Sequence, residues 1–518
     1  EMHNELPPAM PAGNQGVERD ALLELHPADG VPLKLSPTDI AQYIRLQQCR
    51  RFLRLRLVER NNGRRFLRAW DAQPQSIPPI LTLSGREFEE NAELAIDASV
   101  RTFTCSAEER LSQGIESDND FLIELAAALP KGERLVVFQP LLKAEVDGWA
   151  LTGVADVIDF RRDGAGTLSA LIVDFKSTTA ARMEHRLQIA FYREMLDEVL
   201  GRAGMEAATT LGVLYRGAPS AAADTDDPLL DEQRADALAT FGVEGYLERI
   251  EDANALRRHV RSLVLAEASE ARRNLAEPFE ALPFHLNYIC DGCLYNQFCL
   301  RQSAETDDLS LIPFLTMEQK RALQMAGVRR CAELAAVSLP KETWSEQYMQ
   351  LAMAPALGAE LDDLIARART YRESKGDDWP VERWLPDGRQ SSLPRCDPEF
   401  HPNLVKIFID VEHDYLEDRV YLLGALIVAA EHGETPAERR RTVIELADGP
   451  PETPQQESEL LRRWIERVIR AVIDVAAPDA DGNLAAPIHL IFYDDYDRRV
   501  LLTALGRHLG NVFGATAL

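Results

Sequence analysis

The sequence predicts an α/β protein of several domains. Its 518 residues exceed what one hydrophobic core organises, so we expect about three domains. Strand-like stretches alternate with helical segments within residues 35–301, a mixture typical of α/β folds. Helical patterns alone occupy residues 302–376, and strand patterns return in residues 401–518. We expect a flexible leader over residues 1–34 and a linker over residues 377–400.

The first elements are predicted by caps and periodicity. Ser36 is a good N-cap residue, Pro37 suits a first helical turn, and Asp39 complements the positive end of a helix. A helix is therefore expected from there through the segment "RRFLRLRL", and a second helical pattern covers residues 85–103. Strand patterns follow at 134–142, 149–160 and 168–177, and "RRDGAGT" between the last two is a hairpin signal.

The later elements follow from the same periods. The 3.6-residue period returns over residues 181–200, and a long amphipathic helix is expected over residues 245–276. Residues 309–338 predict two helices joined by a Gly-Val turn, the outline of a helix-hairpin-helix unit. The C-terminal domain begins with two strand patterns, followed by a helix over residues 455–474 and another strand.

Composition excludes several classes of protein. The net charge of −27 argues against a protein that coats nucleic acid through bulk electrostatics. The chain has no apolar run of membrane-spanning length and no basic start followed by an apolar stretch, so we expect neither a membrane span nor export. Seven unevenly spaced cysteines suit a reducing compartment better than a disulfide framework. We therefore expect a cytoplasmic protein.

Residues 45–68 differ from the acidic remainder, since they carry nine arginines and one acid, Glu59. A solvated helix face is one interpretation of such a run. The other is a track for nucleic-acid phosphates, because the planar guanidinium fork suits phosphate oxygens. On the second interpretation, Arg50, Arg51 and Arg54 are the candidates for contact with DNA.

Two acids face each other in the predicted hairpin. A turn near Ala165 pairs residues whose numbers sum to about 330, which places Asp156 opposite Asp174. Asp174 and Lys176 share one face of their strand. A divalent cation such as Mg²⁺ would relieve the repulsion between the acids and supply a water nucleophile. The alternative is a solvent-facing hairpin edge with an internal salt bridge.

These residues resemble the PD-(D/E)xK nuclease superfamily, and within it the RecB-like branch. The family's pattern is an acid on an early helix, G-x-A-D on a strand, D-x-K on the next strand and Q-x-x-x-Y on the following helix. The matching residues here are Glu89, Asp156, Asp174, Lys176, Gln188 and Tyr192. The resemblance implies a restriction-endonuclease-like core in which the three acids bind Mg²⁺ or Mn²⁺ and the lysine assists the attack. It also implies that the glutamine and the tyrosine line the DNA groove.

Two assignments within this pattern stay open. Glu87 and Glu90 adjoin Glu89, and the sequence does not fix their helical phase. Gln139, on the preceding strand, either joins the polar floor of the same site or is an ordinary polar residue on a half-exposed strand.

Three cysteines, Cys290, Cys293 and Cys299, have the C-x2-C-x5-C spacing of metal ligands. In iron–sulfur members of the RecB-like branch, the fourth cysteine precedes the nuclease core, and Cys49 occupies that position. The resemblance therefore implies a [4Fe–4S] cluster that ties the first helices to the end of the nuclease domain. Structural zinc, or thiols without a metal, are the alternatives.

A second group of acids lies in the C-terminal domain. Asp410 and Glu412 share one face at the end of an apolar strand, and Asp497 follows a later strand. These residues resemble the first motifs of DEDD-type exonucleases, which have an RNase H-like fold and bind two metal ions. The final motif of that family is missing, so we expect an incomplete domain in a fragment of a longer protein. Solvated acids at strand ends are the alternative.

The sequence thus predicts a Mg²⁺- or Mn²⁺-dependent deoxyribonuclease, an exonuclease rather than an endonuclease, that acts on single strands or ends in repair, recombination or defence. Related proteins continue into a superfamily 1 helicase, so a helicase partner, fused or recruited, is expected. The alternatives are a noncatalytic iron–sulfur module that binds DNA ends for a helicase, and an RNA-processing exonuclease based on the C-terminal domain.

Overall fold

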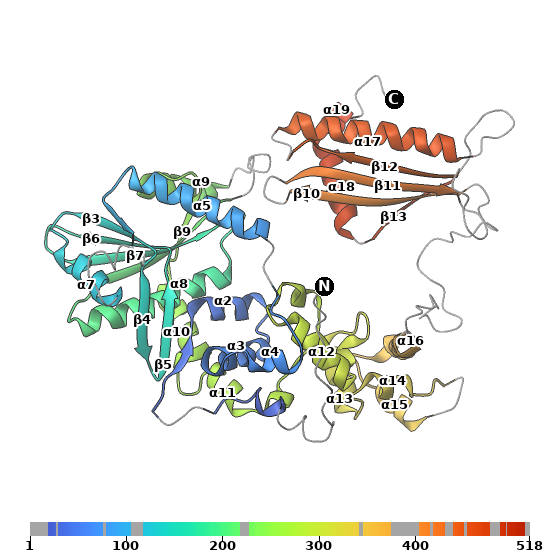
Figure 1. The fold of residues 1–518 in the computed structure, drawn as a ribbon, viewed down its shortest axis with the longest axis horizontal. Helices are drawn as coiled ribbons and strands as arrows, with labels where there is room; N and C mark the ends of the chain where they lie inside the picture. Colours follow the sequence, from blue (N-terminus) through green and yellow to red (C-terminus); the bar gives the residue numbers. More distant parts are fainter. Residues whose placement is uncertain are drawn as a thin grey trace, which may run out of the picture. The chain divides into compact units, whose positions relative to one another are not determined.

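The structure is a computed structural model, and it divides into two compact units. The first comprises Glu1–Gly217 and Thr225–Arg389, and the second Ala218–Asp224 and Gln390–Leu518. Figure 1 shows the elements of each unit. The predicted linker lies outside the described residues, as do residues 1–18 of the predicted leader. The described residues are 19–26, 30–75, 79–104, 118–217, 227–340, 345–373, 404–414, 418–429, 439–449, 453–476, 487–493 and 495–512.

A six-stranded mixed sheet organises the first unit. Its strand order is β2-β3-β6-β7-β8-β9, with β2–β3 and β7–β8 parallel and the other pairs antiparallel. The strands are β2 (Thr102–Thr104), β3 (Arg134–Phe138), β6 (Val157–Arg162), β7 (Leu168–Lys176), β8 (Ala208–Tyr215) and β9 (Tyr246–Arg249). The interior position of β7 explains why its sequence is almost continuously apolar.

The register of the β6–β7 hairpin agrees with the one predicted from the turn. Val157 pairs with Val173, and their numbers sum to 330. The same register carries Asp156, one residue before β6, to the position opposite Asp174. The turn fixes this register, since Asp163 Oδ1 accepts hydrogen bonds from the N–H groups of Gly166 and Thr167 and the Asp163 N–H donates to the Thr167 carbonyl oxygen.

Helices cover both faces of this sheet. Figure 1 shows α8 (Met183–Arg202) on one side and α5 (Pro79–Asp97) with α9 (Pro228–Phe241) on the other. Ile172 of β7 packs in the core cluster that contains α8 residues, whereas Val173 packs with α5 and α9 residues. The sheet therefore lies in the middle of three layers, and the ends of its central strands are enclosed by helices from two sides.

A smaller sheet extends the unit, with the order β1-β5-β4. Its strands are β1 (Leu33–Leu35), β4 (Leu141–Val146) and β5 (Trp149–Val154), and the accompanying helices are α2 (Pro37–Arg45), α3 (Arg50–Asn62), α4 (Arg65–Ala69) and α7 (Asp118–Ala128). The predicted cap is present, since Ser36 Oγ accepts a hydrogen bond from the Asp39 N–H at 3.2 Å. The predicted continuous helix is broken between α2 and α3, where Gln47 and Gln48 have left-handed φ angles of 52° and 57°. This break places Cys49 at the N-cap of α3.

Two further expectations for the first unit differ from the structure. The helix expected over residues 245–276 is divided into β9, α10 (Ala253–Val260), the π-helix η1 (Arg261–Leu265) and α11 (Glu270–Ala276). The Ser269 side chain caps α11, which gives the chain a new helix start. The expected flexible leader also contributes to the core, because Leu23 and Leu25 are buried.

A helical part follows the cysteine region. It contains η4 (Leu309–Leu311), α13 (Met317–Met325), α14 (Cys331–Ala335), α15 (Glu346–Ala352), η5 (Gly358–Glu360) and α16 (Leu361–Glu373). These elements share their own apolar cluster, and Gly327 has a left-handed φ of 86° in the predicted turn between α13 and α14. The predicted domain boundary between residues 301 and 302 falls inside α12 (Asn296–Thr306). Two 3₁₀ turns, η2 (Phe279–Ala281) and η3 (Tyr288–Gly292), precede α12.

The second unit contains a four-stranded sheet with the order β12-β11-β10-β13. β13 is parallel to β10, and the other neighbours are antiparallel. The elements are β10 (Val405–Asp414), β11 (Arg419–Ala429), β12 (Arg440–Leu446), α17 (Pro454–Val475), β13 (Ile488–Phe492), α18 (Asp495–Arg507) and α19 (Leu509–Val512). Leu461 of α17 and Leu501 of α18 pack on the same apolar face of the sheet.

No helix among the described residues combines the length and the apolar character needed to cross a membrane.

Candidate active site

The predicted acid pair lies at the end of the β6–β7 hairpin. Asp156 is partly buried and its Oδ2 accepts a hydrogen bond from the Phe175 N–H at 2.6 Å. Asp174 is only 1% exposed, and its Oδ2 lies 2.8 Å from Lys176 Nζ. Burial raises the pKa of Asp174, Lys176 opposes this effect, and Asp156 adds to it. The three side chains therefore form one charged group that is largely withdrawn from water.

Lys176 remains a cation in this setting. Burial alone would lower its pKa, but the charges of Asp174 and Asp156 outweigh burial and raise the pKa above its ordinary value. One ammonium offsets one of the two carboxylates. The remaining negative charge is the physical reason to expect a bound cation at this position.

Gln188 and Tyr192 approach the acids from α8, one helical turn apart. Gln188 Nε2 donates a hydrogen bond to Asp174 Oδ1 at 3.3 Å. The Tyr192 hydroxyl donates to the Val154 carbonyl oxygen at 2.5 Å, on the segment that leads to Asp156. Gln188 is 9% exposed and Tyr192 is 1% exposed, so the expectation that both line a DNA groove is corrected. They hold the carboxylates in position from within the core.

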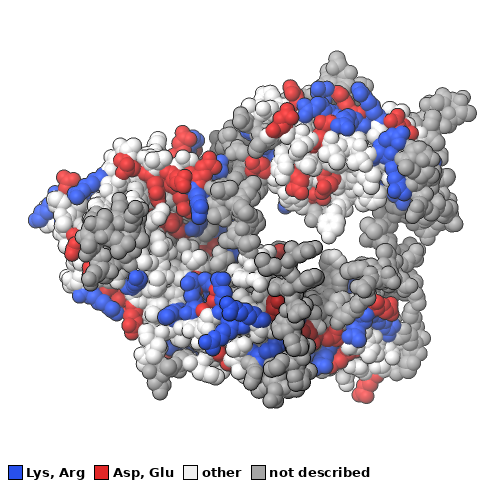
Figure 2. Space-filling model, in the orientation of Figure 1, with Lys and Arg blue, Asp and Glu red and all other residues white. Residues whose placement is uncertain are grey.

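Glu89 faces the same group from α5. Burial, followed by the charge of Asp156, raises the pKa of Glu89 to about 7, while Lys176 opposes the shift. The structure thus favours Glu89 over its neighbours Glu87 and Glu90, which are both exposed. Figure 2 shows acidic side chains gathered over α5.

Two further residues, Glu93 and His185, reach this site without having been assigned from the sequence. Glu93, one helical turn after Glu89, accepts a hydrogen bond from Gln139 Nε2 at 3.0 Å. His185 is buried on α8, and burial, followed by the charge of Lys176, lowers its pKa to about 3. The available signal was helical spacing, because Glu93 lies four residues after Glu89 and His185 lies three before Gln188.

The donor set suits a hard divalent cation. Glu89, Asp156 and Asp174 offer carboxylate oxygens, which are the ligands that Mg²⁺ and Mn²⁺ prefer. Within the described ranges, no three His, Cys, Asp or Glu side chains are grouped closely enough to be recognised as a metal site. The fit therefore rests on the chemistry of the donors and on the negative charge that Lys176 leaves uncompensated.

The four predicted thiols lie within electrostatic reach of one another. Cys49 caps α3, Cys290 lies in η3, Cys293 ends that turn, and Cys299 lies in α12. Burial raises the pKa of Cys299, and the charges of Cys293, Cys49 and Cys290 add to the effect. Burial likewise raises the pKa of Cys293 to about 12. Cys293 and Cys299 are buried, whereas Cys49 and Cys290 are half-buried. Among the described residues these thiols are not grouped closely enough to form a metal site, so a tetrathiolate centre here stays a prediction.

Aromatic packing supports the thiol region. The ring of Phe298 meets those of Phe66 and Trp70 edge-on, with centroids 5.4 and 5.2 Å apart. Arg45 Nη2 donates to the Gly292 carbonyl at 2.6 Å, which ties α2 to the loop between two of the cysteines. Segments more than 200 residues apart in sequence are therefore joined here even without a metal.

The three arginines predicted to contact DNA are engaged within the protein, which corrects part of the DNA-binding prediction. Arg54 is 0% exposed and its Nη1 pairs with Glu24 at 2.7 Å, so it cannot reach a phosphate. Arg50 pairs with Glu277 at 3.0 Å. Arg51 stacks on Phe284, with 3.9 Å between its guanidinium carbon and the ring centroid. These side chains hold α3 against the end of the nuclease domain.

Exposed arginines lie further along the same segment. Arg65 and Arg68 on α4 are exposed, and Figure 2 shows basic side chains gathered over α2 to α4. The sequence did not distinguish these two from the internal arginines, because the run contains basic residues at every helical phase.

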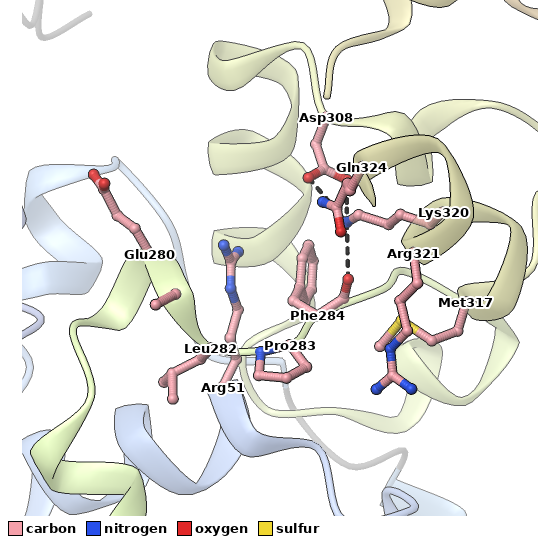
Figure 3. Close-up of a pocket in the computed structure, with 11 residues that line it drawn as sticks. Arg51, Glu280, Leu282, Pro283, Phe284, Asp308, Met317, Lys320, Arg321 and Gln324 are labelled. Carbon is pink, nitrogen blue, oxygen red and sulfur yellow. Dashed lines mark hydrogen bonds and ion pairs between the residues drawn. The ribbon is translucent and has the colours of Figure 1, made fainter. Parts of the chain in front are cut away.

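A pocket of about 220 Å³ lies between the end of the nuclease domain and α13. Figure 3 shows Arg51, Phe284, Asp308 and Lys320 around it. Lys320 Nζ donates to Asp308 Oδ1 at 2.7 Å and to the Phe284 carbonyl at 2.8 Å. Burial lowers the pKa of Lys320, and Asp308 opposes the shift. Lys320 and Asp308 thus pair within the wall of the pocket, and Lys320 ties α13 to the segment of Phe284.

The second predicted acid group is arranged differently. Asp410 and Glu412 are exposed on β10, as the predicted alternation requires, whereas Asp497 is 7% exposed on α18. Burial, followed by the charges of Glu412 and Asp497, raises the pKa of Tyr496. Glu412 and Asp497 thus lie within electrostatic reach of the Tyr496 hydroxyl, and His413 Nδ1 lies 2.5 Å from the same hydroxyl.

Comparison with known proteins finds a family match for just under half of the chain. Residues 49–300 match the sequence model of the PD-(D/E)XK nuclease superfamily. This superfamily indicates a metal-dependent nuclease, whose substrate is nucleic acid. Among curated proteins, none matches the chain. A crystal structure of a protein designated SSO0001 is 13% identical, covers 54% of this chain and 91% of that chain, and has a TM-score of 0.18.

Proposed function

We propose that the domain over residues 35–301 is a RecB-like deoxyribonuclease that hydrolyses phosphodiester bonds of single-stranded DNA or DNA ends. Glu89, Asp156 and Asp174 hold Mg²⁺ or Mn²⁺ in this proposal. The observation that carries it is the buried ion pair of Lys176 with Asp174 at 2.8 Å, opposite a second carboxylate. An uncompensated carboxylate in this setting is costly unless a cation neutralises it.

Each residue then has a defined role. The metal ion, when bound, supplies an activated water and polarises the phosphate. Lys176 stabilises the negative charge that develops on the phosphate oxygens. Gln188 fixes the orientation of Asp174 through its hydrogen bond, and Tyr192 fixes the segment before Asp156. Neutral His185 adds no positive charge beside Lys176.

Substrate contact is assigned to the exposed arginines. Arg65 and Arg68 replace Arg50, Arg51 and Arg54 as the residues that meet phosphates, since they lie at the surface of the basic region over α4. Guanidinium groups bind phosphate oxygens through two parallel hydrogen bonds. A helicase, fused or recruited, would deliver the single strand, and repair, recombination or defence are the pathways that use such an activity.

A [4Fe–4S] cluster is proposed for Cys49, Cys290, Cys293 and Cys299. It would be structural, because it fastens α3 to the end of the nuclease domain. A variant with Cys49→Ser is expected to lose the brown colour and visible absorption of protein purified without oxygen. A colourless wild-type protein that contains zinc would refute the iron–sulfur cluster. The four cysteines would then be a structural zinc site that joins the same two segments.

The nuclease assignment is tested by cutting labelled single-stranded DNA with anaerobically purified protein and Mg²⁺ or Mn²⁺. Lys176→Ala is expected to reduce the rate by about 100-fold or more, because it removes the stabilising charge. Lys131→Ala, an exposed lysine elsewhere in the domain, is the matched control and should cut like wild type. Unchanged cutting by Lys176→Ala would overturn the site. Binding without cutting in every form would instead identify a noncatalytic DNA-end-binding module.

A second metal site is proposed for Asp410, Glu412 and Asp497 in an RNase H-like domain. The strand order of the second unit, with β13 parallel to β10, supports that fold, and the common neighbour of Glu412 and Asp497 supports the site. Processing of RNA by this half is the alternative function. Glu412→Gln should leave the cutting of DNA by the first unit unchanged and reduce any cutting of RNA.

A further inference from the structure

Gln139 adopts an unusual conformation between the two sheets of the first unit. It follows β3 directly, and its φ angle of 51° lies in the left-handed region that disfavours side chains other than glycine. Its backbone N–H donates to the Asp156 carbonyl oxygen at 2.9 Å. The backbone of Gln139 is therefore fixed directly to the residue that carries one of the proposed metal ligands.

The side chain of Gln139 reaches a different element. Its Nε2 donates to Glu93 Oε1 on α5 at 3.0 Å. Burial raises the pKa of Glu93, the hydrogen bond from Gln139 opposes this, and Asp156 adds to it, so Glu93 lies within electrostatic reach of the site. Glu89 lies one turn earlier on the same helix and points to the same side. One glutamine thus connects the helix of Glu89 with the strand end of Asp156.

We propose that the hydrogen bond between Gln139 and Glu93 is a brace that fixes Glu89 against Asp156. The inference rests on the proposed function, because it assumes that both acids bind the same cation. Glu93 is a positioning residue in this account and not a ligand. The apolar contacts of α5, through Ala92 and Ile96, hold the helix against the sheet, and they carry no direction toward the carboxylates. A directed polar contact at the edge does so.

The left-handed backbone of Gln139 also indicates that its side chain serves the contact with α5. Glycine would satisfy this φ angle without strain, yet glycine could not supply the side-chain hydrogen bond. A side chain retained in a disfavoured conformation indicates a use for that side chain. Here the use is the contact with α5, since Gln139 makes its other hydrogen bond through the backbone alone.

The test is Mn²⁺ binding by the full chain, followed by electron paramagnetic resonance, with cutting measured in parallel. Glu93→Ala and Gln139→Gly are each expected to weaken Mn²⁺ binding by about 10- to 100-fold, the usual effect of losing an outer partner of a metal ligand. Glu93→Gln is expected to remain within about threefold of wild type, because its amide oxygen still accepts the hydrogen bond. Glu90→Gln, an exposed neighbour on α5, is the charge-matched control and should bind like wild type.

The variants separate the possible outcomes. If Glu93 is itself a ligand, Glu93→Gln will weaken binding as much as Glu93→Ala, and the brace is overturned. Wild-type affinity in all three brace variants would also overturn it, while leaving the nuclease assignment intact. Absence of Mn²⁺ binding in wild type would overturn both. Gln139→Gly guards against misfolding, because it relieves the backbone strain and should unfold no earlier than wild type while still binding Mn²⁺ more weakly.

Discussion

Two strands of this protein end in nearly the same sequence pattern and have opposite surroundings. β7 ends in the buried Asp174 and the half-buried Lys176, which are paired at 2.8 Å, whereas β10 carries Asp410 and Glu412, which are exposed. β7 lies between two neighbouring strands and under helices on both faces, while the described helices of the second unit pack on one face of β10. An acid at the end of a strand thus acquires a strong demand for a cation only where the fold removes it from water.

The largest effect expected from this difference is on catalysis. Asp174→Asn should reduce cutting of single-stranded DNA by about 1,000-fold or more, because it removes a proposed metal ligand and the partner of Lys176. Asp410→Asn, the corresponding change on β10, should leave that rate unchanged. The comparison would fail if both variants, or neither, lost activity in a labelled-oligonucleotide assay with Mg²⁺.

Buried and exposed arginines should differ in the same way as the buried and exposed acids. Arg54→Met should lower the free energy of unfolding by roughly 3–5 kcal/mol, since it leaves the partly buried carboxylate of Glu24 without its partner. Arg68→Ala should change it by less than about 0.5 kcal/mol, because that side chain is exposed. Urea unfolding measures the first effect. Arg68→Ala should instead weaken DNA binding, which fluorescence anisotropy measures. If the variant binds DNA as tightly as wild type, Arg68 is not one of the phosphate contacts.

A substitution at Gly153 tests how tightly the core is packed around Tyr192. A Cβ at this position would lie 2.8 Å from Tyr192 Cε1 and 2.9 Å from Pro37 Cδ. Gly153→Ala should therefore destabilise the protein by about 1–3 kcal/mol and displace the tyrosine that holds Val154. Gly164→Ala, in the open turn of the hairpin, has no neighbour within 4 Å and is the control. Equal stability of the two variants in thermal unfolding would contradict the packing described.

The smallest expected effect concerns pH. The pKa of Glu89 is raised to about 7, so its carboxyl holds a proton below that pH and must release it to bind a metal. Mn²⁺ affinity should fall by roughly tenfold for each pH unit below 7. The stability of the metal-free protein has the opposite pH dependence. A carboxyl group whose pKa is raised by folding stabilises the folded state at low pH, and this contribution is lost as pH rises through 7. Titration calorimetry between pH 5.5 and 8 would show the first trend, and a flat profile would exclude Glu89 as a ligand.

The hairpin and its acid pair could be predicted because they depend on local information. A turn sequence between two strand patterns sets the register that brings Asp156 opposite Asp174, and the register is the one found. Grouping of the four thiols required the family resemblance, since Cys49 lies 241 residues before Cys290. The break before Cys49 was missed because no glycine or proline marks it; two glutamines adopt the left-handed conformation instead.

Other features depend on contacts between distant segments and left no readable pattern. Arg54 belongs to a run that looks uniformly solvent-exposed, and only the approach of residues 23–24 and 274–277 buries it. The Gln139–Glu93 hydrogen bond joins residues 46 positions apart on a strand end and a helix. The burial of Tyr192 follows from the packing of α8 on β5, which the Q-x-x-x-Y spacing alone does not specify.

The central claim is that a divalent cation makes the buried acids of the hairpin tolerable, and unfolding with and without Mn²⁺ tests it most directly. At 100 times its dissociation constant, Mn²⁺ should stabilise the wild-type protein by about 2.7 kcal/mol. Asp156→Asn should be more stable than wild type without metal and should gain little from Mn²⁺, because the repulsion and the ligand are removed together. A wild-type protein that gains nothing from Mn²⁺, or an Asp156→Asn variant that gains as much, would contradict the account.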